Sequence, residues 1–336
     1  MLDYLKNAFL HSEVGRPYND ELINLRCSYG FTFDKRKFVT DYSHINDFLN
    51  KIRAMAVELY FHSPFMELII RDCKINNWVD IENLYFIEIK RLSEFETRDG
   101  YLQELNALND SLNKLRDKLF DYLKELNSSI NIDFKSDQAE KFLEILGQES
   151  KQSVLKNGYA DDTLVLNFNY TDTVSKYLMN LGKRHFKEIK IHGNMREKNS
   201  IIFGYGDEMD DAISDLEKKN DNLFFTHLKS FGYFKNSDYQ EAMNFLDSEE
   251  KSINVHIIGH SLGLSDRILL NQIFEHNSIN QIKIYYHKSQ NGEDDFINKT
   301  HEISRHFKNK SLMRKIIIPF TYSEAVPQKN YSRLDG

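Results

Sequence analysis

The stretch Asn254-Val-His-Ile-Ile-Gly-His-Ser-Leu-Gly-Leu-Ser-Asp266 decides how this chain is interpreted. It begins as an apolar, β-branched run typical of a strand and ends in a turn of glycines and polar residues. The string Gly-His-Ser-Leu-Gly matches the nucleophile elbow G-x-S-x-G, in which Ser261 would attack a substrate. Alternatively, Gly259 to Ser261 form a turn that meets the polar part of a dinucleotide at the end of a strand.

Two runs upstream share this pattern. Leu164-Val-Leu-Asn-Phe-Asn-Tyr-Thr171 and Ile189-Lys-Ile-His-Gly193 are short apolar runs that end abruptly in polar residues. Because ligands bind at the carboxyl ends of the strands in open α/β sheets, we expect the polar residues to converge on one crevice. The expected set is Asn167, Asn169, Thr171, His192, Gly193, His260, Ser261 and Asp266.

The composition indicates a globular protein. The chain has 336 residues, of which 40% are hydrophobic and 13% aromatic, enough for one large domain or two ordinary ones. A net charge of −7 and a pI near 6.0 argue against a generally basic surface for nucleic acid. Neither the two cysteines nor the histidine spacing predicts a metal site. No run approaches the roughly 18 apolar residues that a membrane span needs, so we expect a cytoplasmic protein.

Periodicity divides the chain near residue 150. Residues 1–150 are expected to be mainly helical, with helices at 45–60, 78–92 and 101–127. In the last of these, a seam from Leu105 to Leu126 predicts a helix about 40 Å long that packs in an antiparallel hairpin or against a second copy of the chain.

Residues 151–336 change to an alternation of strands and helices. Strands are expected at 163–168, 188–191, 201–203, 254–258, 282–286 and 315–318, and helices at 172–181, 266–274 and 294–307. The predicted fold is therefore α/β, with a Rossmann-like, mainly parallel sheet and a large helical cap or insertion. The two regions could also form one integrated domain.

A serine hydrolase would need an acid and then a histidine downstream of Ser261. The candidates are Asp294 or Asp295 and His301 or His306. Only 75 residues follow Ser261, and the candidates fall largely within one loop and helix instead of on separate strand ends. The hydrolase is therefore the alternative to a nucleotide-binding protein.

Taken in order, the three strand ends resemble the T-x-N-x-D, H-G and G-x-S-L motifs of sirtuin-like NAD-binding domains. The resemblance implies that Asn169 positions the nicotinamide ribose and that His192 is a general base on a ribose hydroxyl. It also implies that Gly259 and Ser261 contact the dinucleotide. An imidazole can take a hydroxyl proton near neutral pH, and a glycine turn lets backbone N–H groups approach phosphate.

A longer series of motifs resembles the bacterial abortive-infection family AbiH, over about residues 75–300. In order, the motifs are Trp78-Val-Asp-Ile-Glu82, Leu166-Asn-Phe-Asn-Tyr-Thr171, Ile191-His-Gly193, Ile201-Ile-Phe-Gly204, Lys229-Ser-Phe231, Ile258-Gly-His-Ser-Leu-Gly-Leu-Ser-Asp266 and Ile284-Tyr-Tyr286. This resemblance implies an antiphage factor that stops growth or kills the infected cell, and that responds to a nucleotide or a phage product. It leaves open whether the protein hydrolyses NAD or a related nucleotide, or acts as a sensor without catalysis.

The start of the chain departs from that family. Such proteins usually begin with a strand and a turn of the type G-N-G-F-D, whereas the nearest string here is Ser28-Tyr-Gly-Phe-Thr-Phe-Asp34. Met1-Leu-Asp-Tyr-Leu5 resembles the helix that would follow such a turn. We therefore expect the chain to lack the first strand and glycine turn of its nucleotide site, through truncation or divergence.

The candidate residues also have structural explanations. His192 could be held by backbone hydrogen bonds at the end of its strand. Thr171 and Asp172 are good N-cap residues for the helix that follows them, and Ser265 or Asp266 could cap the next one.

Overall fold

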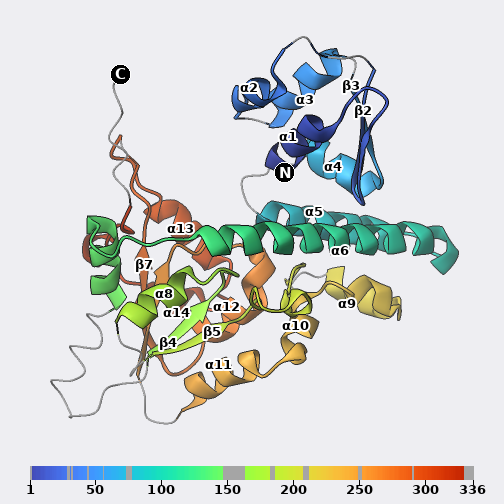
Figure 1. Ribbon diagram of the computed structural model, residues 1–336. Coiled ribbons are helices and arrows are strands. Elements are labelled where there is room, and N and C mark those ends of the chain that lie inside the picture. The colour runs from blue at the N-terminus through green and yellow to red at the C-terminus, as the bar shows by residue number, and fades with distance from the viewer. Residues whose placement is uncertain are drawn as a thin grey trace. The chain divides into compact units, whose positions relative to one another are not determined.

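The computed structural model describes residues 2–28, 31, 33–43, 45–55, 57–72, 78–146, 163–181, 186–206, 212–248, 252–289 and 291–328 (Figure 1). The chain divides into two compact units, residues 1–115 and 116–336, which meet within helix α6 (Arg98–Ser129). The boundary expected near residue 150 lies outside the described residues.

The first unit contains a small antiparallel sheet among its helices. Its elements are α1 (Leu2–His11), β1 (Tyr18–Asn19), β2 (Ile23–Cys27), α2 (Lys35–Thr40), α3 (Ile45–Ala54), β3 (Val57–Phe61), α4 (Pro64–Asp72), α5 (Trp78–Ser93) and the start of α6. The strand order is β1-β2-β3, and Leu25 pairs with Leu59.

This sheet corrects the expectation of one helix over residues 45–60, because the helix ends at Ala54 and a strand follows. Val57-Glu-Leu-Tyr-Phe61 alternates apolar and polar side chains over five residues, which is the period of a strand. Pairing with β2 places Val57 in the core and leaves Glu58 exposed.

Helices α5 and α6 form an antiparallel hairpin in the first unit. Arg91 of α5 lies 2.8 Å from Glu104 of α6, and the hydroxyl of Tyr85 donates to Oδ1 of Asn109 over 2.6 Å. The contacts between α5 and α6 confirm the antiparallel hairpin, and the leucine seam is buried from Leu105 to Leu119. Beyond it the seam becomes exposed, since Tyr122 and Leu126 face solvent. Packing against a second copy stays a prediction.

The second unit is an α/β arrangement. After α6 its elements are β4 (Thr163–Asn167), α8 (Thr173–Asn180), β5 (Phe186–Lys190), η1 (Lys198–Ser200), α9 (Ala212–Lys218), η2 (Asn222–Phe225), α10 (Lys229–Gly232), η3 (Tyr233–Lys235), α11 (Asp238–Asp247), β6 (Ile253–Ile258), η4 (Leu264–Asp266), α12 (Arg267–Phe274), β7 (Ile279–Tyr285), α13 (Phe296–Ser304), α14 (Lys310–Ile316) and η5 (Phe320–Tyr322).

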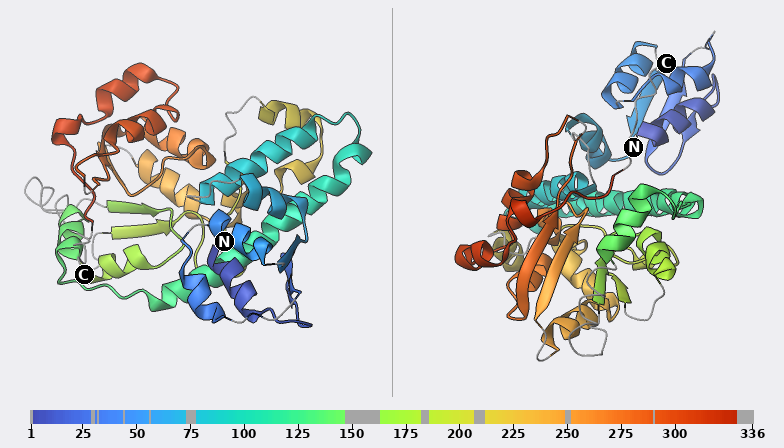
Figure 2. Two further views of the ribbon diagram at one scale, coloured as in Figure 1. Left: turned by 90° about the horizontal axis from the view of Figure 1, so that it is seen from above. Right: turned by 90° about the vertical axis from the view of Figure 1, so that its left-hand side faces the viewer.

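Its strands pair in parallel, as predicted, but in two separate pairs. Strand β4 pairs with β5, with Leu166 opposite Ile189, and β6 pairs with β7, with Ile257 opposite Ile284 (Figures 1 and 2). Helices α8 and α12 make the two crossovers, as parallel pairing requires. Within the described residues no ladder joins the pairs, so the fold is mixed α/β with small parallel sheets.

Two expected strands are absent as such. Residues 201–203 are extended but belong to no strand, although the N–H of Ile202 bonds to the carbonyl of His192. Residues 315–318 were expected as a strand, but α14 runs to Ile316 and only Ile317 forms a bridge, to Ile282. Helix is favoured over strand here because the side chain of Asn309 caps the helix start by accepting the N–H groups of Ser311 and Leu312.

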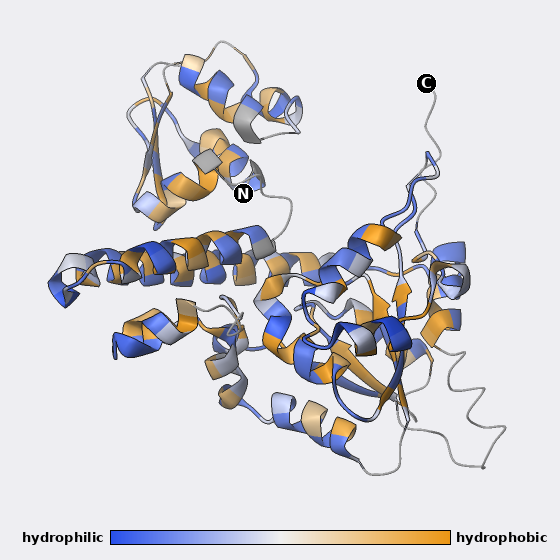
Figure 3. Cartoon of the chain, turned by 180° about the vertical axis from the view of Figure 1, so that it is seen from behind, coloured by the Kyte–Doolittle hydropathy of each residue, from blue (hydrophilic) through white to orange (hydrophobic). Residues whose placement is uncertain are grey.

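The core of the second unit lies on β6 and β7 and under the helices around them. Figure 3 shows apolar residues on the strands and on one side of many helices. Leu269 of α12, Ile282 and Ile284 of β7, and Ile303 of α13 are completely buried. Burial of this apolar surface is the main force that holds the strand ends in place.

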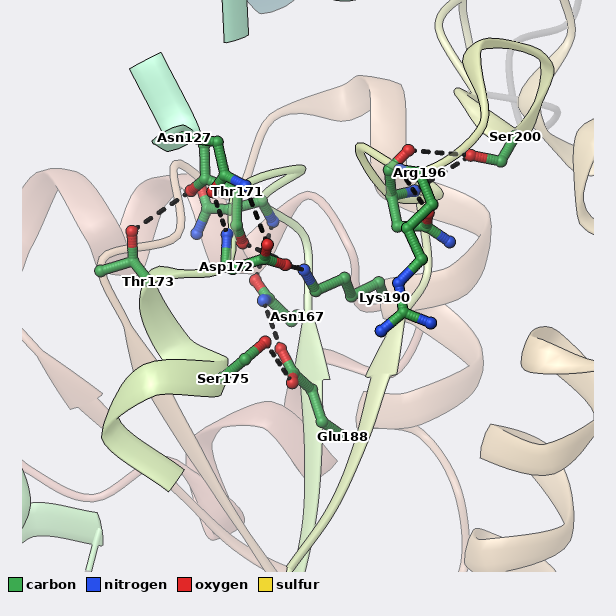
Figure 4. Close-up of polar contacts among 12 residues, drawn as sticks. Asn127, Asn167, Thr171, Asp172, Thr173, Ser175, Glu188, Lys190, Arg196 and Ser200 are labelled. Carbon is green, nitrogen blue, oxygen red and sulfur yellow. Dashed lines mark hydrogen bonds and ion pairs between the residues drawn. The ribbon is translucent and has the colours of Figure 1, made fainter. Parts of the chain in front are cut away.

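Helix α8 is fastened at its start by a polar network (Figure 4). Asp172 occupies the N-cap position, but its side chain makes no capping bond. Its carboxylate pairs instead with Lys190 of β5 and accepts from Nδ2 of Asn127, whose Oδ1 accepts the N–H of Asp172 over 2.7 Å. Burial would raise the pKa of Asp172, but the bonds from Lys190 and Asn127 lower it below its usual range.

We predict that Asn127→Ala loosens the start of α8, because the N–H and carboxylate of Asp172 both lose a partner. The loss should be about 1–2 kcal/mol, so the Asp172 amide should exchange with solvent roughly five to thirty times faster. Ser128→Ala is the matched control, because its hydroxyl bonds only within α6, to the carbonyl of Glu125. Equal exchange rates in the two variants would contradict the role of Asn127.

Candidate functional site

Asn167 ends strand β4, and its side chain forms hydrogen bonds that support the fold. Its buried side chain accepts the N–H of Asn169 over 2.9 Å and donates to Oε1 of Glu188 over 2.8 Å (Figure 4). Ser175 of α8 donates to the other oxygen of Glu188. The amide of Asn167 therefore shapes the turn after β4, whereas Asn169 at the tip of that turn is exposed.

Thr171 lies half-buried beside the start of α8. Its hydroxyl is 3.3 Å from that of Thr173, and its carbonyl accepts from Lys190. These contacts place it in the network that fastens α8.

His192 follows strand β5, and its side chain is only 6% exposed. The next residue, Gly193, has a φ of +91°, and a Cβ there would lie 2.1 Å from the carbonyl oxygen of Ser200. Glycine is therefore required for the chain to turn away after His192. The ring of Phe168, from the end of β4, contacts the ring of His192 at 5.4 Å and that of His260, after β6, at 4.3 Å. Phe168 thus joins the ends of three strands.

Asp266 is the centre of this group. Its Oδ1 lies 3.0 Å from Nε2 of His192 and 3.0 Å from Nζ of Lys229, and its Oδ2 lies 3.6 Å from Nε2 of His260. Burial alone would raise the pKa of Asp266, but Lys229 and the two histidines lower it well below its usual range. The side chain is therefore a carboxylate at neutral pH. Its role as an N-cap is excluded, because it makes no capping bond to α12.

The negative charge of Asp266 makes the stability of the fold depend on pH. A carboxyl whose pKa is lower in the folded chain stabilises the fold above its unfolded pKa and loses that contribution as the pH falls. The site should therefore be less stable in acid.

Lys229, whose only marking in the sequence is the motif Lys229-Ser-Phe231, is a further member of the site. It begins α10, its side chain is 2% exposed, and Nζ also lies 3.3 Å from the hydroxyl of Ser265. The available signal was a single lysine in the aromatic run Phe224-Phe-Thr-His-Leu-Lys-Ser-Phe231. A buried lysine in such a run requires a buried anion.

Two glycines allow the backbone of Lys229 to reach this position. The N–H of Lys229 donates to the carbonyl of Tyr205 over 2.8 Å, so residues 204–206 lie against residues 227–229. A Cβ at Gly204 would lie 1.9 Å from the carbonyl oxygen of His227, and one at Gly206 would lie 2.1 Å from that of Ser265. Both contacts are with backbone, which cannot give way as a flexible side chain can.

We predict that Gly206→Ala destabilises the second unit by about 1–3 kcal/mol and separates Lys229 from Asp266, because the added methyl forces two backbone segments apart. A lower thermal midpoint would show this. Gly100→Ala is the control: Gly100 lies in α6, and the nearest atom to its Cβ, 3.2 Å away, belongs to the side chain of Phe95. An equal midpoint for Gly206→Ala and wild type would disprove the close approach.

The turn after β6 is held by two histidines. Leu262 is completely buried and has a φ of +60°, which is unfavourable for leucine. Its N–H donates to Nδ1 of His260 over 2.9 Å, and Nε2 of His306 donates to its carbonyl over 2.9 Å. His260 must therefore carry its proton on Nε2, which faces Asp266. Burial lowers the pKa of His306, so this ring is neutral at neutral pH.

The same turn weighs against the serine hydrolase. The positive φ of this turn falls on Gly259 and Leu262, whereas a nucleophile elbow strains the serine itself. Ser261 is exposed, and its hydroxyl has no hydrogen bond to any described residue.

The proposed acids and bases are engaged elsewhere. Asp294 accepts the N–H of Phe296, Asp295 accepts the N–H of His287, and His306 is bonded to Leu262. His301 is exposed on α13. Among the described contacts, none connects Ser261 to a histidine and an acid.

We predict that a fluorophosphonate probe leaves Ser261 unlabelled, because no histidine activates its hydroxyl. Mass spectrometry of the treated protein, with a known serine hydrolase labelled in the same sample, is the measurement. Stoichiometric modification of Ser261 would reinstate the hydrolase.

Of the expected residues, the structure brings together His192, His260 and Asp266. Phe168 and Lys229, which were not in the expected set, lie with them. Asn167 and Gly193 support the backbone of the turns that follow β4 and β5. Asn169 and Ser261 are the exposed members of the expected set, and Gly259, the predicted dinucleotide contact, is exposed as well. Within the described residues, no three His, Cys, Asp or Glu side chains are grouped to hold a metal ion. None of the described helices is long and apolar enough to cross a membrane.

Comparison with known proteins identifies a family. The family model described as bacteriophage abortive infection AbiH matches residues 30–288, well over half of the chain, and includes the whole expected set from Asn167 to Asp266. No curated protein and no solved structure matches. The chain therefore belongs to the AbiH family, and this membership supports a role in abortive infection by bacteriophage.

Proposed function

We propose that the protein acts in abortive infection by binding NAD or a related nucleotide at the strand-end site and hydrolysing its glycosidic bond. The observation that carries the proposal is the buried carboxylate of Asp266, held between His192 and Lys229 beside the ends of parallel strands. A histidine paired with a carboxylate is a common general base, and the carboxyl ends of parallel strands are the usual ligand-binding edge.

His192 is the proposed base. With its proton on Nε2, toward Asp266, the lone pair on Nδ1 is available for a hydroxyl proton of the ribose. Nε2 is buried and forms no aligned hydrogen bond, although Oδ1 of Asp266 is only 3.0 Å away. A small rotation of the ring on ligand binding would align the pair and stabilise the imidazolium that forms.

The reaction balances without a further reagent. The bond between the ribose C1′ and the nicotinamide nitrogen breaks, and its electron pair goes to that nitrogen. The oxygen of a water molecule bonds to C1′, and one proton is released. The products are nicotinamide, ADP-ribose and the proton.

The exposed members of the site are proposed to contact the nucleotide. Asn169 would position the ribose, while the turn from Gly259 to Ser261 would offer backbone N–H groups to the phosphates. Gly259 suits this role, because a Cβ built there meets no atom within 4 Å.

A sensor without catalysis is the second candidate. The contact of Phe168 with both His192 and His260 favours it, because a ligand that shifted this ring would change the surroundings of both histidines. Binding without turnover would then be the signal.

We predict that purified protein releases nicotinamide from NAD and that His192→Gln reduces the rate at least a hundredfold, the usual scale for loss of a general base. His276→Gln is a close control. Nε2 of His276 also lies 3.0 Å from an aspartate oxygen, that of Asp247, but this aspartate is on the surface. Liquid chromatography of nicotinamide and calorimetry of NAD binding should be run together, with phage plating on cells that carry each variant.

The results separate the two candidates. NAD binding without nicotinamide release, with protection lost in His192→Gln, would favour the sensor. Full protection and no NAD binding in His192→Gln and wild type alike would refute both.

A further inference from the structure

We propose that Lys229 is a positioning residue of the site: by pairing with Oδ1 of Asp266, it keeps both histidines neutral, so that His192 can accept a proton. This rests on the proposed function, in which His192 is the base. Nζ of Lys229 pairs with the carboxylate that also contacts His192, so the lysine acts on the histidine through Asp266.

The charges of the site support this role. Asp266 carries one negative charge and Lys229 one positive charge, and each side chain is at most 6% exposed. The pair is therefore balanced with both imidazoles neutral. Without the lysine, the buried carboxylate would be compensated most easily by a proton on His192, 3.0 Å away. A protonated His192 cannot serve as a base.

A proton on His260 could also compensate the negative charge of Asp266, but it would break a hydrogen bond. Its Nδ1 accepts the N–H of Leu262, and a protonated ring has no acceptor there. Protonation would leave a completely buried residue of unfavourable φ without one of its two hydrogen bonds. His192 is thus the ring that would be protonated if Lys229 were lost.

The other charged groups near the site leave this balance unchanged. Nζ of Lys299, from α13, donates to the backbone carbonyl of His260 over 2.7 Å. Burial lowers the pKa of His306, after α13, and the charge of Arg267, at the start of α12, lowers it further, so His306 is neutral. In the described contacts, the positive charge that pairs with Asp266 comes from Lys229.

The position of Lys229 is fixed by backbone. Its N–H bond to Tyr205 and the close approach of Gly206 to Ser265 hold α10 against the turn that carries Asp266. Gly232, at the other end of α10, approaches Ile202, where a Cβ would lie 2.8 Å from the side chain. These backbone contacts hold the ammonium of Lys229 close to Asp266, as is needed if the lysine is to control the protonation of His192.

The test is the pH dependence of nicotinamide release in three variants of the full chain. Lys229→Met should move the acidic limb of the profile to higher pH by about one unit or more, because His192 then holds its proton more tightly. Lys229→Arg keeps the charge and should leave the limb within a few tenths of a unit of wild type. The double variant Lys229→Met with Asp266→Asn removes both charges and should move the limb back toward wild type.

A second readout works without turnover. The imidazole signals of His192 in protein labelled with ¹⁵N-histidine report its titration directly, and the midpoint should rise in Lys229→Met and return in the double variant. If wild type releases no nicotinamide but these midpoints move as stated, the proposed reaction fails and the electrostatic role of Lys229 stands. An unchanged midpoint in folded Lys229→Met would overturn the proposal. If that variant does not fold, Lys229→Gln takes its place, because it also removes the charge, and an unchanged midpoint there would overturn the proposal equally.

Discussion

The site depends on one requirement: the buried carboxylate of Asp266 must have a cation. A charged group removed from water is costly unless it is paired and hydrogen-bonded, and here one ammonium and two imidazoles surround it. Several local features of the second unit follow from this pairing. The glycines at 204 and 206 let the chain that carries Lys229 come close, and the turn at Leu262 aims His260 at the same carboxylate.

The sequence predicted the polar strand ends well because their pattern is local. Apolar runs that stop at Asn167 and Ile258 define two strand ends within a residue of those observed, and the parallel rule then brings their neighbours together. Lys229 could not be assigned in this way. Its partner lies 37 residues further along the chain, and its burial depends on glycine contacts that no periodicity reveals.

The errors have the same origin. The alternating residues 57–61 form a strand by pairing with β2, and residues 315–316 remain helical because of an asparagine cap several residues earlier. Asn167, by contrast, stays a predicted ligand contact, although its amide already bonds to the turn after β4 and to Glu188. A polar residue at a strand end therefore indicates a site, whereas its hydrogen bonds decide between binding and support.

Helix α6 has a practical consequence for dividing the molecule. The two compact units meet between Leu115 and Arg116, inside a helix that continues from Arg98 to Ser129. A chain cut at this boundary would begin or end within a helix, where up to four N–H or four C=O groups lose their intrahelical partners. It would also divide the leucine seam, separating Leu119 from Leu105 and Leu112. The units are thus distinct in their packing but are not separable by a simple truncation, and limited proteolysis should find no exposed linker at their junction.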